Sequence, residues 1–151
     1  MHHAGSRMSV WHDALEIGLL PLEETGLYCD GMTYVISHLL RKGGIPHRCF
    51  IGYVKDEKRG DLVAPHCWVK LVGDGDWVID LRLRTWLGDD DEVPHGVFQT
   101  TKWSRFTYKG EPMVDIKLDE EIVAAMTDGK LSHVKVPERN DYSVPFLRDL
   151  L

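Results

Sequence analysis

Residues 26–31, Gly26-Leu27-Tyr28-Cys29-Asp30-Gly31, lead directly into an apolar pattern with the period of a helix. Five apolar residues recur at the spacing of one helix face: Met32, Val35, Ile36, Leu39 and Leu40. We predict a helix from Cys29 to Lys42 that Gly43-Gly44 ends, with Gly26 supplying a bend before it. Cys29 then lies in the first helical turn, where the helix dipole favours thiolate over thiol.

The part of the chain before this stretch is expected to add one more helix. Ser9 can cap it, and apolar residues with a rough helical period continue as far as Leu20-Pro21. Residues 21–26 are expected to form a loop. Residues 1–7 resemble an expression-tag scar or a frayed terminus, so we leave them out of the fold and expect a single domain over residues 8–151.

The part of the chain after this stretch reads as strands. Residues 47–54 and 66–72 are rich in strand formers, with a polar loop over 55–64 between them. Residues 73–76, Gly-Asp-Gly-Asp, predict a hairpin turn into a third strand over 77–81. Pairing Val72 with Trp77 across this turn puts His66 within about one strand pair of Asp80.

The last third of the sequence has a weaker pattern. Residues 96–108 predict one or two strands and 114–118 another, and 119–127 predict a short helix started by acidic residues. The tail from Pro137 is expected to be irregular. The predicted fold class is therefore α+β, with N-terminal helices packed on an antiparallel sheet and Cys29 at a helix N-terminus.

Composition restricts the partners and the compartment. The 151 residues carry a formal charge of −6, and the basic residues near Lys55 are interleaved with acids, which argues against nucleic acid or anionic lipid as a partner. No stretch has the length and hydropathy of a secretion signal or a membrane span, so we expect a cytoplasmic protein. Three cysteines without a Cys-x-x-Cys spacing do not suggest a disulfide framework.

Three residues have the chemistry of a thiol-nucleophile site. A cysteine nucleophile needs a base within hydrogen-bond reach, and that base needs a third group to orient it. Cys29 at a helix start, with His66 and Asp80 on neighbouring strands, can meet this requirement. The unpaired N–H groups of the same helix start could hold the oxyanion of a tetrahedral intermediate.

Across residues 26–82 the chain resembles the core of the transglutaminase-like cysteine protease superfamily, which has a papain-like fold. The resemblance lies in Cys29, Leu39-Leu40-Arg41-Lys42-Gly43-Gly44-Ile45-Pro46-His47-Arg48, Ile51-Gly52-Tyr53-Val54, His66-Cys67-Trp68-Val69-Lys70-Leu71 and Trp77-Val78-Ile79-Asp80. It implies that Cys29 is the nucleophile, that His66 is the general base and acid, and that Asp80 orients the imidazole.

The chain departs from the family pattern in two places. Cys67 stands where the family usually has a small alanine. No glutamine or asparagine precedes Cys29 to complete an oxyanion hole, and the nearby donors are Trp11, His12 and Tyr28. Nothing resembles a calcium loop either.

Several other residues receive a structural or a binding interpretation. Tyr28, Trp68 and Trp86 are expected to contact substrate, whereas Cys49 and Cys67 are expected to pack as small apolar residues inside strands. The soft ligands around His47 and His66 do not predict zinc, because neighbouring strand residues such as His66 and Cys67 point to opposite faces. We expect no metal and no cofactor.

The expected activity is that of a cysteine-dependent amide hydrolase, a peptidase or amidase acting on a peptide or protein through a Cys29 thioester. A transglutaminase with an amine acceptor shares the first half-reaction and is an alternative. A leader-peptide maturation peptidase is another alternative. A catalytically silent peptide-binding domain is the third, although such a domain would have no chemical reason to keep Cys29, His66 and Asp80. The sequence does not predict an oligomeric state.

Overall fold

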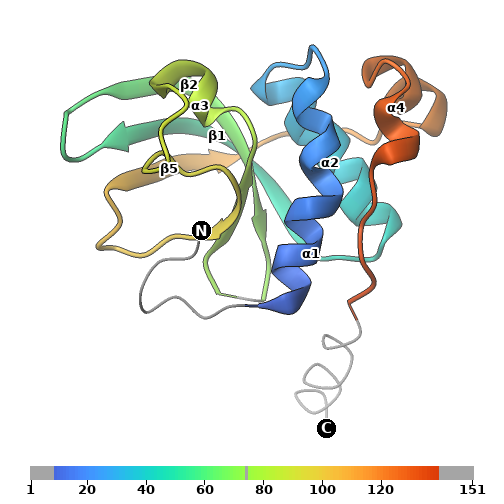
Figure 1. Ribbon diagram of the computed structural model, residues 1–151, viewed down its shortest axis with the longest axis horizontal. Helices are drawn as coiled ribbons and strands as arrows, with labels where there is room; N and C mark the ends of the chain where they lie inside the picture. The colour runs from blue at the N-terminus through green and yellow to red at the C-terminus, as the bar shows by residue number, and fades with distance from the viewer. Residues whose placement is uncertain (1–8, 74, 140–151) are drawn as a thin grey trace, which may run out of the picture.

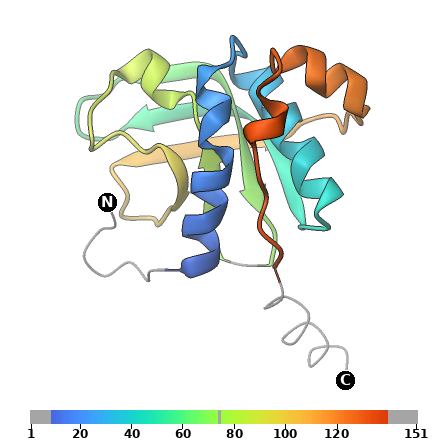
Figure 2. The ribbon, with the colours of Figure 1, turned by 45° about the vertical axis from the view of Figure 1, so that its right-hand side comes forward.

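The two longest helices pack on one face of a five-stranded antiparallel sheet in the computed structural model, which describes residues 9–73 and 75–139 (Figure 1). This arrangement confirms the predicted α+β class. Turning the molecule shows α1 (Val10–Leu19) and α2 (Cys29–Lys42) over the same side of the sheet, with the chain before residue 139 running between them (Figure 2). Residues 1–7, interpreted above as a tag scar, lie outside the described residues.

The first helix begins where its cap predicts. The Ser9 side chain accepts a hydrogen bond from the His12 N–H, and the helix buries Leu15 and Leu19. A 3-10 turn, η1 (Leu20–Glu24), replaces the first part of the predicted loop. Ile17 is one of the apolar residues in the rough helical period that predicted this helix, yet it is 69% exposed. The buried face instead follows the three- and four-residue steps between His12, Leu15 and Leu19.

The second helix has the predicted bounds. Val35, Ile36 and Leu40 are fully or almost fully buried, and Gly44 takes the left-handed conformation (φ +69°) that ends many helices. Gly26 was predicted to supply a bend before the helix, and its conformation differs from that prediction. Its φ is not positive and a Cβ there would meet nothing within 4 Å, so the approach to Cys29 does not depend on glycine.

The sheet has the strand order β4-β3-β2-β1-β5, and all four pairings are antiparallel. The strands are β1 (His47–Asp56), β2 (Leu62–Leu71), β3 (Trp77–Asp80), β4 (Gly96–Gln99) and β5 (Phe106–Pro112). The second strand begins four residues before His66, where it was predicted to start. Leu62 and Val63 pair with Lys55 and Val54 of β1, so the polar stretch between them is shorter than its composition indicates.

The hairpin between β2 and β3 has a register one residue away from the predicted one. Lys70 pairs with Val78 and Val69 with Ile79, while Gly73 and Gly75 supply the positive φ values expected of the turn. These are the two pairs that β2 and β3 form. The backbone of β2 from His66 to Trp68 therefore lacks a strand neighbour on the β3 side.

The rest of the chain is partly as predicted. The two strands β4 and β5 confirm that residues 96–108 contain strands, and α4 (Glu120–Met126) has its cap at Asp119. Two short helices, α3 (Leu83–Leu87) and η2 (Lys130–His133), were not predicted. The strand predicted over 114–118 is wrong: this segment crosses from β5 to α4 without pairing, and Val114 is 77% exposed.

Two apolar clusters lie on the two faces of the sheet. One joins α1 and α2 to the sheet through residues such as Leu15, Ile36 and Ile79. The other lies on the opposite face, where the sheet is curled enough for Phe98 of β4 and Tyr108 of β5 to touch at a ring-centroid distance of 5.9 Å. None of the helices between residues 9 and 139 combines the length and hydropathy of a membrane span.

Candidate active site

His66 and Asp80 form the most buried polar contact of the site. The His66 Nε2–H donates to Asp80 Oδ2 over 2.7 Å, and the two side chains are 0% and 1% exposed. The shift of one residue in the β2–β3 register keeps them diagonal neighbours at the end of the paired region. The predicted contact between these two residues is therefore present.

The Asp80 carboxylate is held by three further donors. The backbone N–H groups of Arg82 and Leu83 donate to Oδ1 over 2.9 and 3.1 Å, and the Tyr108 hydroxyl donates to Oδ2 over 2.8 Å. A carboxylate with this many hydrogen bonds keeps one orientation. It holds the imidazole of His66 in the tautomer with its proton on Nε2.

Asp80 occupies Nε2 of His66, so Nδ1 is the ring nitrogen that is left for Cys29. Nδ1 is buried and has no hydrogen-bond partner among the described residues, while Cys29 and His66 shift each other's pKa. With Nε2 protonated, Nδ1 carries the lone pair. The arrangement is that of a base facing a thiol.

Cys29 is the first residue of α2, as predicted, with Tyr28 as the N-cap residue. Further along the turn, the Gly31 N–H donates to Asp30 Oδ1 and the Met32 N–H to the Tyr28 carbonyl. Among the residues that the structure describes, the N–H groups of Cys29 and Asp30 have no hydrogen-bond acceptor. They are the backbone donors that a helix start offers to a developing anion.

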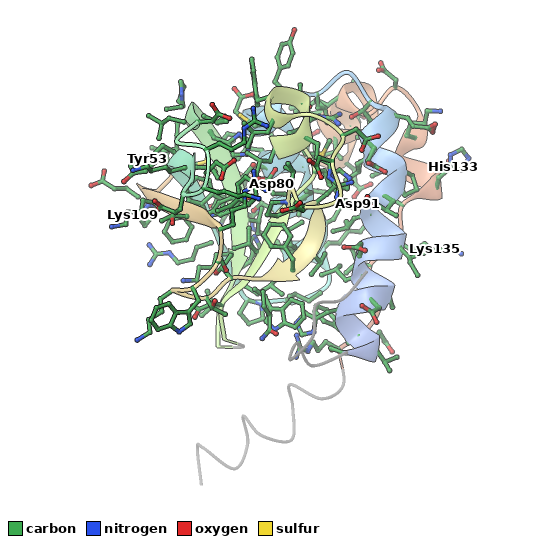
Figure 3. The ribbon with its side chains drawn as sticks, turned by 60° about the vertical axis from the view of Figure 1, so that its left-hand side comes forward. Tyr53, Asp80, Asp91, Lys109, His133 and Lys135 are labelled. Atoms are coloured by element: carbon green, nitrogen blue, oxygen red, sulfur yellow. The ribbon has the colours of Figure 1, made fainter. Side chains whose placement is uncertain are left out.

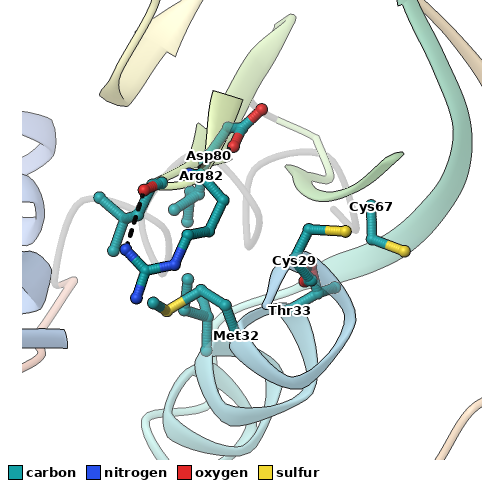
Figure 4. A pocket seen from close by; sticks show the side chains of 9 residues that line it. Cys29, Met32, Thr33, Cys67, Asp80 and Arg82 are labelled. Carbon is teal, nitrogen blue, oxygen red and sulfur yellow. Dashed lines mark hydrogen bonds between the residues drawn. The ribbon is translucent and has the colours of Figure 1, made fainter. Parts of the chain in front are cut away.

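The side chain of Cys67 lies beside that of Cys29 at one end of the pocket drawn in Figure 4. A hydrogen bond from the Cys67 thiol is the main influence that lowers the pKa of Cys29. Burial opposes it, and the His66 ring and the Cys67 N–H lower that pKa further. The Cys67 N–H can reach the sulfur because β2 has no strand neighbour there. Cys29 is thus expected to be ionised to the thiolate at pH values well below those at which a cysteine thiol ordinarily ionises.

His66 is shifted in the opposite direction. Burial disfavours the imidazolium, but hydrogen bonds to Asp80 and Cys29 together with the charges of both raise the pKa of His66 to about 9. A low thiol pKa beside a high imidazole pKa favours the thiolate–imidazolium pair at neutral pH.

Arg82 connects the strand that carries Asp80 to the loop that carries Cys29. Its guanidinium donates to the carbonyls of Leu27 (2.7 Å), Thr25 (2.9 Å) and Glu23 (3.2 Å). Figure 4 shows Arg82 and Asp80 on one side of the pocket and Cys29 on the other. Because one side chain holds three carbonyls of residues 23–27, Arg82 fixes the approach to the helix start.

Two of the three side-chain donors considered for an oxyanion hole are engaged elsewhere. The Trp11 Nε1–H donates to the Pro137 carbonyl, and the ring of His12 stacks on Trp77 at a centroid distance of 3.5 Å. Tyr28 adjoins Cys29 and is 78% exposed. The backbone of α2 and Tyr28 are therefore the remaining candidates near the thiol.

The three residues predicted to contact substrate are in different environments. Tyr28 lies at the surface next to Cys29, and Trp86 is 64% exposed on α3. Trp68 is 3% exposed and packs between Phe50 and Tyr108 on the face of the sheet away from α1 and α2. It lines an open pocket of about 320 Å³ there, together with these two aromatic rings.

Sequence reasoning missed three residues of the site. Tyr108 contacts Asp80, and Arg82 contacts the 23–27 loop. Cys67 is buried, as predicted, and its side chain also lies beside that of Cys29. Figure 3 shows Asp80 inside the molecule, whereas the labelled Tyr53 and Lys109 lie at its edge. Tyr108 at an inward position of β5 could have suggested a partner for Asp80, but the long connection from β3 hides the pairing.

No group of three or more His, Cys, Asp or Glu side chains within residues 9–73 and 75–139 is placed to hold a metal ion. Searches of protein-family models, of curated proteins and of solved structures found no match to this chain. The function is therefore argued from the geometry of the site.

Proposed function

We propose that the protein is a cysteine-dependent amide hydrolase in which Cys29, His66 and Asp80 form the catalytic triad. The observation that carries this proposal is the buried His66, whose Nε2 donates to Asp80 over 2.7 Å while its buried Nδ1 has no hydrogen-bond partner among the described residues and its ring lowers the pKa of Cys29. A histidine that only filled space would not need both a charged partner and an unpaired buried nitrogen beside a thiol.

In the first half-reaction the Cys29 thiolate attacks the carbonyl carbon of a peptide amide. The developing oxyanion is stabilised by the Cys29 and Asp30 N–H groups at the start of α2. The His66 imidazolium then donates its proton to the leaving amine, which breaks the C–N bond and leaves a thioester on Cys29. Asp80 keeps the ring aligned and stabilises its charge throughout.

In the second half-reaction neutral His66 takes a proton from water, and the resulting hydroxide attacks the thioester. The tetrahedral intermediate collapses, the C–S bond breaks, and the thiolate–imidazolium pair is restored. The partial exposure of Cys29 is compatible with entry of water.

The same observations support a transglutaminase-like, papain-like assignment for the fold. A cysteine at a helix start packs on an antiparallel sheet whose strands carry the histidine and then the aspartate, in the order in which the family has them. We further propose a peptide or protein as substrate and a cytoplasmic location, where the three cysteines would stay reduced.

Peptide-library hydrolysis tests the function. The wild-type protein and the Cys49→Ala control should cleave the same peptides, whereas Cys29→Ala and His66→Ala should lose cleavage by at least about a thousandfold. Repeating the reaction with a small primary amine distinguishes acceptors, because an amidated product identifies amine transfer. Cleavage retained by Cys29→Ala would refute the proposal.

A further inference from the structure

Cys67 is a second thiol in the site, and the proposed hydrolysis does not use it as a nucleophile or as a base. It is 4% exposed on β2, and its side chain lies beside that of Cys29 across the junction of α2 and β2. Both line the same narrow pocket with Met32 and Thr33 (Figure 4). Two thiols that lie side by side can form a disulfide when their sulfur atoms approach to the S–S bond length of about 2.05 Å.

The two thiols differ in a way that suits different roles. Cys29 is partly exposed and faces His66, so a small oxidant can reach it and a proton donor is at hand. Cys67 is buried behind it, and its hydrogen bond to Cys29 and its burial raise the pKa of its thiol. Of the pair, Cys29 is therefore the thiol that an oxidant attacks first.

We propose that Cys67 is the resolving cysteine of Cys29: once a hydroperoxide has oxidised Cys29, Cys67 captures it in a disulfide that switches the site off reversibly. The Cys29–Cys67 disulfide would join α2 to β2 through the two sulfur atoms. It would also keep Cys29 from advancing to the sulfinic acid, which thiols do not reduce.

The chemistry balances with a hydroperoxide as the oxidant. The Cys29 thiolate attacks one peroxide oxygen, the S–O bond forms and the O–O bond breaks, and the departing oxygen takes a proton from His66. Cys29 is then a neutral sulfenic acid, so the negative charge that had raised the Cys67 pKa is gone. Cys67 attacks the Cys29 sulfur, the S–S bond forms, and the sulfenic oxygen leaves as water with the Cys67 proton.

The third cysteine does not compete for this role. Cys49 lies on β1, its thiol points to the Thr33 carbonyl at 4.0 Å, and burial raises the pKa of that thiol. It serves as the matched control, because trypsin cleavage after Arg41, Arg48 and Arg59 puts each cysteine on a separate peptide.

The test is mass mapping after a brief treatment with hydrogen peroxide in slight excess, without reduction. Wild type and Cys49→Ala should lose the mass of two hydrogen atoms and yield a cross-linked Cys29–Cys67 peptide pair that dithiothreitol separates. Cys67→Ala, with Cys67→Ser as a second variant, should instead gain two oxygen atoms at Cys29 that dithiothreitol does not remove. Circular dichroism checks that each variant is folded.

Wild-type protein that gains two oxygen atoms at Cys29 as fast as Cys67→Ala would overturn the inference, and so would a cross-link to Cys49. The mass readout does not require turnover, so it stands even if the proposed hydrolase activity is wrong. The disulfide itself does not depend on the proposed function. What rests on that function is the expectation that the disulfide stops peptide cleavage and that its reduction restores cleavage.

Discussion

Tyr108 and His66 donate to the same oxygen atom of Asp80, at 2.8 and 2.7 Å, although Tyr108 comes from the far edge strand of the sheet. The shared oxygen means that Tyr108 limits how strongly the carboxylate can attract the imidazolium. The tyrosine is thereby part of the electrostatic balance of the site, and burial together with the Asp80 charge holds the pKa of its hydroxyl well above the ordinary value.

Replacing Tyr108 with phenylalanine should therefore raise the pKa of His66 further and reduce peptide cleavage by about tenfold, since one hydrogen bond to a charged group is worth about 1.5–3 kcal/mol. The NMR titration of the His66 ring measures the pKa. Tyr53→Phe is the control, because the Tyr53 hydroxyl has no hydrogen-bond partner in the described part of the chain. A His66 titration unchanged by Tyr108→Phe would contradict this role.

Arg82→Lys should separate the helix start from the strand that carries Asp80. A lysine cannot reach the Leu27, Thr25 and Glu23 carbonyls together, so acceptors that include the part-buried carbonyls of Leu27 and Thr25 lose partners. We expect slower alkylation of Cys29 and a free energy of unfolding lower by about 2–4 kcal/mol. Arg48→Lys, at an exposed position on β1, should change neither. Equal effects of the two variants would show that Arg82 does not hold the approach to the start of α2.

The pH dependence of Cys29 alkylation follows from the direction of its pKa shift. The thiol pKa is lowered, so iodoacetamide should modify Cys29 at pH 6 well before Cys49 or Cys67, whose thiol pKa values are raised. Between pH 6 and 8 the Cys29 rate should barely change, whereas an ordinary thiol gains about tenfold per pH unit. Equal labelling of the three cysteines would refute an activated thiol.

Peptide cleavage should behave differently from alkylation at high pH. His66 must be protonated to donate to the leaving amine, so cleavage should fall as the pH rises through about 9, where His66 loses its proton. Alkylation needs only the thiolate and should not fall there.

The Cys67→Ala substitution removes the main influence that lowers the Cys29 pKa. The alkylation rate of Cys29 at pH 6 should therefore be lower in this variant than in the wild-type protein.

Asp56 and Arg105 supply a test of stability away from the site. Arg105 donates twice to the Asp56 carboxylate, at 2.8 and 2.7 Å, and this holds the pKa of Asp56 well below its usual range. A lowered carboxyl pKa contributes stability above the unfolded-state value that is lost as the pH falls through the folded-state value. Asp56→Asn should therefore lower the Tm at pH 7 and change it less at pH 3. Asp61→Asn, with an exposed contact of 3.8 Å to Arg59, is the control.

Gly52 of β1 lies where a side chain would clash with the backbone of β5. A Cβ at Gly52 would lie 2.0 Å from the Lys109 carbonyl oxygen, so Gly52→Ala must push the two strands apart. We expect a loss of about 1–3 kcal/mol in chemical denaturation. Gly26→Ala, which meets open space, should be close to neutral. A neutral Gly52→Ala would contradict the close approach.

Local patterns predicted the elements with strong periodicity. The α2 bounds followed from five apolar residues at helical spacing and a glycine stop, and the β2–β3 hairpin followed from its Gly-x-Gly turn. The contact between His66 and Asp80 tolerated a register error of one residue, because a diagonal pair is still within reach of long side chains.

Features that depend on distant strands could not be predicted in the same way. Tyr108 reaches Asp80 only because the sheet curls, and the strand predicted over 114–118 failed because β5 had already taken the edge of β1. Alternation along a strand suggested that His66 and Cys67 would be separated. Both nevertheless interact with Cys29, because the thiol lies at the β2 edge that β3 leaves open.

The hydrogen bonds that Arg82 donates to residues 23–27 have a consequence while the chain is being synthesised. His66 and Cys67, which lower the Cys29 pKa, and Arg82, which holds its helix start, follow Cys29 in the chain by 37, 38 and 53 positions. A growing chain that ends before His66 thus carries a thiol without these partners. The low pKa of the Cys29 thiol arises only once the later strands have been made and the sheet has formed.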